Sequence, residues 1–328
     1  MNLPRRRFLA ASAAALTPMI GPAARAQPAP TPGFPVRPVR LIVPFPPGGA
    51  TDALARQIAE NLARQWQHPV VVDNRPGANT MLGTEVVARS APDGHTLGIV
   101  TGSHVINPML SARMPYDTLR DLTGVMLLTR FHMALYAHPS LPASTPAELV
   151  QLARRDPGRV AYAYATTQTL LAMELLNTMA GTRMQSVPYK GSAQAMTDLL
   201  GGHVQLLADP LTQGAMEHVR NGRLKLIGTM GERPAALAPQ ASLMSQAVPG
   251  YEFSGAFGLV ARGGTPPALV SRIRDDFAAV LGQSEVLARI RDIGQEPIGS
   301  TSGQYNAYIL AEMAKWEPVI KSTGARLD

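Results

Sequence analysis

The residues best placed to do chemistry form a short loop between an apolar run and a helical pattern. This loop reads Pro-Phe-Pro-Pro-Gly-Gly-Ala-Thr-Asp over residues 44–52. Paired glycines let backbone amides approach a ligand without a β-carbon in the way. The N-terminus of a helix also presents unpaired N–H groups, which favour an anion such as a carboxylate. The candidate ligand-binding residues of this loop are Pro47, Gly48, Gly49, Ala50, Thr51 and Asp52.

The same loop is explained about equally well as an ordinary helix start with a tight turn, in which Thr51 caps the helix. The loop is not a P-loop, because no Gly-Lys-Ser/Thr follows the glycines. It also lacks the third glycine of the dinucleotide-binding fingerprint. Nucleotide binding is therefore not predicted.

A second group of candidates stands after the next two predicted strands. Residues 101–104 read Thr-Gly-Ser-His and combine hydroxyls, a glycine and an imidazole, and the segment runs on to Asn107. Asn79 begins a predicted helix, where its side chain would cap the helix or donate to a ligand. For His104 a structural role is favoured over ligand binding. The candidates of this group are Asn79, Thr101, Gly102, Ser103 and His104.

The second half of the chain repeats the pattern with other polar residues. Thr166 and Thr167 join a strand to a helix and would bind a carboxylate or carbonyl, cap the helix, or do both. Asp209 ends another strand just before Pro210. It would accept a hydrogen bond from a ligand or cap the helix that follows, and neither role is preferred.

No pattern of catalytic or metal-binding residues accompanies these loops. The chain of 328 residues has no cysteine, which removes thiolate nucleophiles, Cys-rich zinc sites and iron–sulfur clusters. Its histidines are scattered without metal-ligand spacing, and it has no Gly-x-Ser-x-Gly elbow. We predict no enzyme activity, no cofactor and no metal.

The first 26 residues have the layout of a secretory signal. Arg5–Arg7 precede an alanine-rich apolar run, and Ala24–Ala26 form a small-x-small cleavage pattern. The Arg-Arg-x-Phe-Leu order also fits a twin-arginine signal. The alternative is a short membrane anchor, but the run is short and poor in Leu, Ile and Val. We predict cleavage near Ala26 and a periplasmic location.

Removal of this segment changes the charge of the chain. It takes away four arginines and no acids, so the formal net charge falls from +7 to +3. No block of Lys and Arg with interleaved aromatic residues remains, and nucleic-acid binding is not supported. A mildly basic protein suits anionic ligands.

The elements that position the candidate loops alternate between strand and helix, which is typical of parallel α/β sheets. A Pro-rich leader, residues 27–38, precedes them. The first run has strands at 39–45, 69–73 and 96–101 and helices at 51–66 and 79–89. A long strand at 125–136 leads to a second run with a capped helix at 145, strands at 160–164, 184–188, 204–208 and 224–229, and helices at 168–179, 192–200 and 211–221. A return strand at 253–261 and helices at 266–281, 285–293 and 302–322 close the chain.

This order predicts two βα lobes, with the second inserted into the first. Lobe 1 would comprise residues 39–127 and 258–328, and lobe 2 residues 128–257. The strands 125–136 and 253–261 would cross between the lobes. A ligand cleft would then lie between the lobes at the carboxyl ends of the strands.

Several segments match, in order, the motifs of one family. They are Val-Pro-Phe-Pro-Pro-Gly-Gly-Ala-Thr-Asp (43–52), Val-Val-Val-Asp-Asn-Arg-Pro-Gly-Ala (70–78), Ala-Pro-Asp-Gly-His-Thr-Leu (91–97), Ile-Asn-Pro (106–108), Val-Pro-Tyr-Lys-Gly-Ser-Ala (187–193) and Asp-Leu-Leu-Gly-Gly-His-Val-Gln (198–205). Through them the chain resembles the Bug-type receptors of tripartite tricarboxylate transporters, from about residue 36 to the C-terminus.

The resemblance implies an α/β class II periplasmic binding protein that holds a small carboxylate through backbone amides, hydroxyls and waters. It implies that the ligand loops of lobe 1 are Pro47–Asp52 and Thr101–His104, and that the partner is a two-component membrane permease. The match fails at Ala165–Thr169, where the family has a longer loop rich in Gly, Ser and Asn with a histidine, and where Ala172 stands near the histidine's place. The identity of the ligand is therefore not implied.

These observations predict a monomeric periplasmic receptor that captures a small organic carboxylate and delivers it to the permease. The alternative is a sensor that presents its ligand to a signalling protein. An enzyme on the same fold would need a nucleophile or an acid/base pair in the cleft, and the sequence offers none.

Overall fold

The computed structural model describes residues 33–323. The predicted signal peptide and residues 27–32 of the predicted leader lie outside the described residues. Within residues 33–323, no helix has both the length and the apolar character needed to cross a bilayer.

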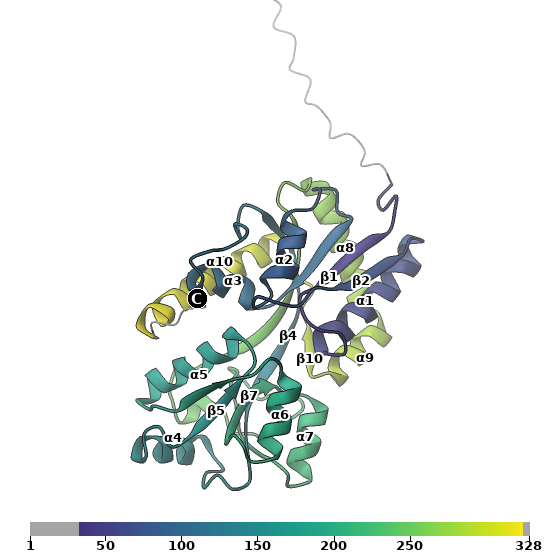
Figure 1. Ribbon diagram of the computed structural model, residues 1–328. Coiled ribbons are helices and arrows are strands. Elements are labelled where there is room, and N and C mark those ends of the chain that lie inside the picture. The colour runs from purple at the N-terminus through teal and green to yellow at the C-terminus, as the bar shows by residue number, and fades with distance from the viewer. Residues whose placement is uncertain (1–32, 324–328) are drawn as a thin grey trace, which may run out of the picture. The chain divides into compact units, whose positions relative to one another are not determined.

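Strands and helices alternate as predicted and build a first sheet around the N-terminal strands (Figure 1). Its order is β2-β1-β3-β9-β4, and β10 pairs with the other edge of β4. β1, β2 and β3 are parallel, whereas β9 runs antiparallel to both β3 and β4. The bounds are β1 Val39–Val43, β2 Val70–Asn74, β3 Thr96–Val100, β4 Leu122–Ala137, β9 Ser254–Arg262 and β10 Gln295–Pro297.

The second sheet is built by the middle of the chain. β5 is parallel to β6 and β7, while β4 runs antiparallel to β7 and to β8. The bounds are β5 Ala161–Tyr164, β6 Gln185–Pro188, β7 Leu206–Pro210 and β8 Lys225–Thr229. β4 therefore belongs to both sheets.

The two halves of β4 have different partners. Leu122–His132 pair with β9, and Met133–Ala137 pair with β7. The strand predicted at 125–136 as a crossover thus passes from one sheet to the other. β9 pairs only within the first sheet, and the amide of Phe253, just before it, donates to the carbonyl of Met230 after β8 at 2.7 Å. The proposed lobe limits at 127/128 and 257/258 stay predictions.

Helices pack around both sheets. With the first sheet lie α1 Ala50–Trp66, α2 Met81–Ala88, α3 Ser103–Leu110, α8 Pro267–Leu281, α9 Ser284–Asp292 and α10 Ser302–Thr323. With the second lie α4 Pro146–Arg155, α5 Thr167–Ala180, α6 Ser192–Leu200 and α7 Gln213–Arg220, followed by the short 3₁₀ turn η1 Met244–Gln246.

Apolar periodicity explains these elements. β1 reads Val-Arg-Leu-Ile-Val and is buried on both faces, as a central parallel strand must be. α1 places Leu54, Ile58 and Leu62 four residues apart, and all three are buried against the sheet. Burial of each such side chain stabilises the fold by about 1.5–3 kcal/mol.

Three details of the sequence prediction were incomplete or wrong. α3 was not predicted, because it is short and contains Pro108, which normally ends a helix. β10, three residues long, was also not predicted. The prediction that Thr51 caps α1 is wrong: Gly49 is the capping position, and Thr51 lies buried inside the first turn.

Candidate functional site

The register of the strands brings the carboxyl ends of β3, in the first sheet, and of β7, in the second sheet, toward the same region of β4. At the end of β3, Val100 lies opposite Gly258, which in turn lies opposite Leu127 of β4. At the end of β7, Pro210 lies opposite Met133. The loops after β1 and β3 and those after β5 and β7 therefore extend toward each other, which is where open α/β sheets bind ligands.

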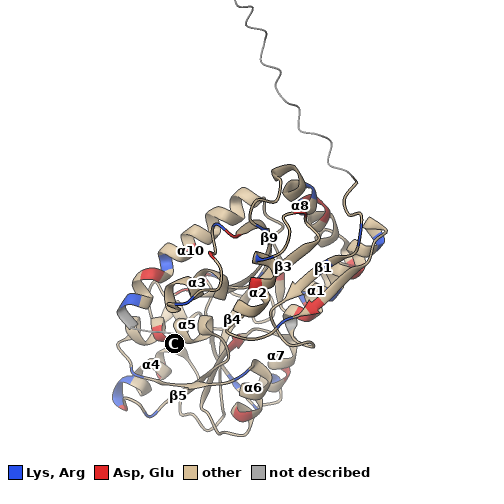
Figure 2. Ribbon diagram, turned by 45° about the horizontal axis from the view of Figure 1, so that its top comes forward, with Lys and Arg blue, Asp and Glu red and all other residues tan. Residues whose placement is uncertain are grey.

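One contact joins these two sets of loops directly. α3 and α5 touch, as Figure 2 shows, and at the start of both helices Gly102 faces the side chain of Gln168. A β-carbon on Gly102 would lie only 2.3 Å from the Gln168 carboxamide. A β-carbon here would therefore require the Gln168 side chain to shift. The structure thus brings Gly102 into contact with the residue that directly follows the predicted Thr166 and Thr167.

The loop before α1 is organised by Asp52. The Asp52 carboxylate accepts hydrogen bonds from Gly48 N at 2.9 Å, Arg56 Nε at 2.9 Å and Asn74 Nδ2 at 3.0 Å. Burial alone would raise the pKa of this carboxyl, but the three donors and the Arg56 charge together lower it. Asp52 is almost fully buried, so it shapes the loop from behind rather than facing a ligand.

This network changes which amides of the loop are available. The Gly48 amide, predicted as a ligand contact, is already used by Asp52. The amides of Gly49 and Thr51 form no hydrogen bond to any residue among 33–323. Pro47, Gly48 and Gly49 are exposed. The anion-binding potential of the loop therefore rests on the first turn of α1, which begins at Ala50.

Asn79 is held by α3 instead of capping α2. Its Nδ2 donates to Asn107 Oδ1 at 2.6 Å, and Asn107 Nδ2 donates back to the Asn79 carbonyl at 2.9 Å. The pair fixes an unusual turn in which Ala78, Asn79 and Thr80 have φ of 45°, 49° and 74°. Residues other than glycine rarely adopt this left-handed backbone conformation, so the turn depends on the contacts that hold it.

Residues 101–104 provide uncharged polar groups. Thr101 and Gly102 are half-buried, whereas Ser103 and His104 are at most 2% exposed. Neither Ser103 Oγ nor His104 Nδ1 has a hydrogen-bond partner among the described residues. Burial lowers the pKa of His104 to about 4, so its imidazole is neutral at neutral pH.

In the second sheet the predicted threonines have different roles. Thr166 caps α5: its Oγ1 accepts from Thr169 N at 3.2 Å, and Thr166 N donates back to Thr169 Oγ1 at 3.2 Å. Thr167 is buried in the first turn of the helix. Capping, one of the two predicted roles of Thr166, is therefore present, and ligand binding by both threonines stays a prediction.

Asp209 lies within β7, one residue before its end. Its Oδ1 accepts from Ser192 Oγ at 2.6 Å at the start of α6. The alternative that Asp209 caps the following helix is wrong, because Thr212 caps α7 through a bond from Ala215 N at 3.3 Å. Desolvation raises the pKa of the Asp209 carboxyl to about 7, although the Ser192 hydrogen bond opposes this rise.

The sequence prediction missed one residue of this region, Gln168. Asn107 stands within the quoted Ile-Asn-Pro segment, three residues beyond the predicted residues 101–104. Gln168 directly follows the two predicted threonines. A rule that takes one full helical turn after each strand end would have included both Gln168 and Thr169.

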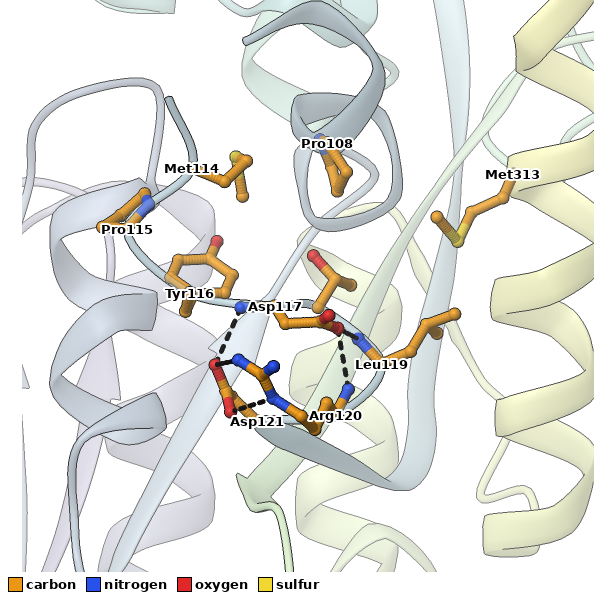
Figure 3. Close-up of a pocket in the computed structure, with 10 residues that line it drawn as sticks. Pro108, Met114, Pro115, Tyr116, Asp117, Leu119, Arg120, Asp121 and Met313 are labelled. Carbon is orange, nitrogen blue, oxygen red and sulfur yellow. Dashed lines mark hydrogen bonds and ion pairs between the residues drawn. The ribbon is translucent and has the colours of Figure 1, made fainter. Parts of the chain in front are cut away.

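A hollow of about 470 Å³ lies away from these loops, between α3, α10 and the segment that leads into β4 (Figure 3). Asp121 accepts there from Asp117 N at 2.8 Å and from Arg120 Nε at 3.1 Å. None of its lining residues is a predicted site residue; they are Pro108, Met114, Pro115, Tyr116, Asp117, Thr118, Leu119, Arg120, Asp121 and Met313.

Residues 33–323 contain no cluster of three or more His, Asp or Glu side chains that would hold a metal ion. The polar groups that meet at the strand ends are amides, hydroxyls and a neutral imidazole. Such a set recognises an anion or carbonyl through hydrogen bonds.

Comparison with known proteins identifies relatives over nearly the whole described chain. Residues 54–325 match the family model described as "Tripartite tricarboxylate transporter family receptor". Protein BugT of Bordetella pertussis is 32% identical over 299 residues, which are 90% of this chain and 91% of that protein.

Two of the similar solved structures are of proteins in complex with a ligand. R. palustris Rpa4515 with adipate is 33% identical, covers 89% of this chain and 98% of its own, and superposes with a TM-score of 0.82. MatC from Rhodopseudomonas palustris with bound malate is 28% identical, covers 88% of this chain and 100% of its own, and has a TM-score of 0.78. The predicted class II periplasmic binding fold is confirmed by these superpositions.

Proposed function

Because the chain belongs to the family of tripartite tricarboxylate transporter receptors, we propose that it is a periplasmic receptor for a small dicarboxylate. It binds the ligand between the loops 46–52 and 101–104 of one sheet and 165–169 of the other. It delivers the ligand to a two-component membrane permease and carries out no chemistry on it. Residues 1–26 act as its export signal, on the twin-arginine route.

The observation that supports this proposal is the set of uncharged hydrogen-bonding groups at the facing carboxyl ends of the strands. Unpaired amides at the start of α1 stabilise one carboxylate through the helix dipole by about 0.3–1 kcal/mol. Uncharged hydroxyl and amide groups on α3 and α5 suit a second carboxylate or its bound water. The similar proteins described with adipate and with malate are consistent with a ligand that has two carboxylates.

Thermal melting of residues 27–328 against mono-, di- and tricarboxylates tests the ligand class. A ligand at 100 times its Kd should add about 2.7 kcal/mol of stability. This corresponds to a rise of roughly 5 °C in Tm for a protein of this size class. If a sugar or an amine raises the Tm while every carboxylate leaves it unchanged, the proposed function is wrong.

The raised pKa of Asp209 predicts how ligand binding depends on pH. With a pKa of about 7, its carboxyl is neutral below that pH and charged above it. A dianionic ligand nearby is repelled by the charged form and therefore binds more weakly as the pH rises from 6 to 8. Titration calorimetry at three pH values should show this loss in the wild type and none in D209N. An identical pH profile in both proteins would remove Asp209 from the site.

A further inference from the structure

β4 changes its partner strands at one point, and the edge strand β10 ends beside that point. His132 is the last residue of β4 that pairs with β9, in the first sheet, and Met133 is the first that pairs with β7, in the second sheet. β10 runs along the edge of β4, with Glu296 opposite Arg130 (Figure 1). A side chain of β10 can therefore contact both sheets.

Glu296 uses its two carboxylate oxygens for partners from different parts of the fold. Its Oε2 accepts from Arg233 Nη2 at 2.6 Å, and Arg233 lies in the segment that follows β8 of the second sheet. Its Oε1 lies 3.2 Å from His132 Nε2. Because an ionised carboxylate only accepts hydrogen bonds, His132 donates here through a proton on Nε2. Glu296 thus connects the point where β4 changes sheets to the segment after β8.

Two glycines allow the chain to pack closely around these contacts. Gly294, just before β10, has a φ of 76°, and a β-carbon on it would overlap the carbonyl oxygen of Leu211, the residue that follows β7. A β-carbon on Gly231 would lie 3.0 Å from His132 Nδ1. β10 and the turn before it therefore contact the part of the chain that builds the second sheet at Leu211 as well as at Arg233.

These contacts exist in a conformation in which candidate loops of the two sheets meet. Gly102, after β3, contacts the side chain of Gln168 at the start of α5. A ligand held between these loops requires the same relative orientation of the two sheets. Contacts that favour this orientation in the ligand-free protein reduce the cost of ordering the loops on binding.

We propose that Glu296 is a positioning residue that forms a latch with Arg233 and His132 and holds the two sheets in the orientation in which the ligand binds. This inference rests on the proposed function. The side chains of Arg233 and Glu296 are 69% and 33% exposed, so water competes for their ion pair. The latch can therefore open and close, and it acts without contact to the candidate ligand loops.

Titration calorimetry with malate and adipate as probes tests the effect of the latch on affinity. R233A and E296A should each raise the Kd of the probe that the wild type binds by about twofold to fivefold, the range expected for a partly exposed ion pair. R233E should weaken binding further, because two like charges would then face each other. The double variant R233E/E296R exchanges the two charges and should recover part of the lost affinity.

Spin labels measure the orientation of the two sheets directly. The chain has no cysteine, so A279C on α8 and Q151C on α4, both at exposed positions, would carry the only two labels. R233A and E296A should broaden the distribution of distances between the labels in the ligand-free protein. The charge exchange in R233E/E296R should narrow it again.

R159A is the matched control. Arg159 pairs with Asp156 at 3.3 Å after α4, and the two side chains are 74% and 35% exposed, much like the latch pair, but they join no two sheets. R159A should change neither the label distances nor the Kd. Melting curves report whether each variant is folded.

The two measurements separate the latch from the proposed function. If R233A and E296A leave the distance distribution as narrow as in the wild type, the latch is overturned, while dicarboxylate binding by the wild type upholds the proposed function. A broader distribution with an unchanged Kd would overturn the role of the latch in binding. If the wild type binds no dicarboxylate, the proposed function fails, and the label distances still decide whether Glu296 holds the two sheets.

Discussion

Replacing Asp52 by asparagine should weaken ligand binding by at least about tenfold, because the loop before α1 loses the group that organises it. The Asp52 carboxylate accepts from the Gly48 amide, from Arg56 and from Asn74. An asparagine has a single acceptor oxygen and would turn its NH₂ toward one of these donors. The loop would then relax, and the amides of the first turn would no longer point at a fixed place.

The same substitution should lower the free energy of unfolding by about 1.5–3 kcal/mol, the usual contribution of hydrogen bonds to a charged group. The pKa of Asp52 is lowered in the folded protein from its ordinary value of 3.8. Its contribution is therefore fully present above that pH and is lost as the pH falls through the folded pKa. The difference in Tm between wild type and D52N should accordingly be large at pH 7 and shrink in acid.

D73N is the matched control for D52N. Asp73 lies on β2 next to Asn74 and accepts from Arg40 at 2.6 Å and from Arg75 at 2.8 Å, but it takes no part in the loop before α1. Its side chain is 21% exposed, so breaking its ion pairs in D73N should lower the free energy of unfolding by less than D52N does. D73N should leave the ligand Kd unchanged. Equal losses of affinity in D73N and D52N would contradict the role given to Asp52.

The sequence was sufficient for the order of the elements because their apolar patterns are regular. The strand at 39–45 is apolar except for Arg40, and the helix at 51–66 repeats its apolar residues at helical spacing, so neither depends on distant contacts. α3 depends on them. It is short and contains Pro108, and its buried face is covered by α10 and α5, which the sequence does not reveal.

The predicted loops lie at the facing ends of the strands, but the roles of their side chains could not be assigned from local sequence. Asp52 was predicted to face the ligand, and it turns back to bind Asn74, which lies 22 residues away along the chain. Asn79 was predicted to cap a helix or to donate to a ligand, and it pairs with Asn107, 28 residues away. Each role is decided by a partner on another loop, and only the assembled sheet brings those partners within hydrogen-bond distance.

Replacing Asn107 by leucine should destabilise the protein by about 3 kcal/mol and lower the Tm by roughly 6 °C. Asn107 is fully buried and forms two hydrogen bonds with Asn79, one in each direction. Leucine has a similar size but neither donor nor acceptor, so both polar groups of Asn79 lose their partner. Amide hydrogen exchange should then rise in residues 75–81 and stay unchanged in α5, since only the turn before α2 is released.

The left-handed conformation of Asn79 allows a second prediction, which compares two substitutions of Asn79 itself. Both N79A and N79G remove the bond from Asn79 Nδ2 to Asn107 and keep the backbone carbonyl that accepts from Asn107 Nδ2. Alanine, however, keeps a β-carbon at a φ of 49°, whereas glycine does not. A β-carbon in this conformation costs about 1–2 kcal/mol. N79G should therefore be more stable than N79A by about 1 kcal/mol, in contrast to the order seen inside helices, where alanine is favoured. Chemical denaturation of the two variants measures this difference directly. An N79A protein as stable as N79G would show that the turn is free to leave the left-handed region and that Asn107 does not hold it there.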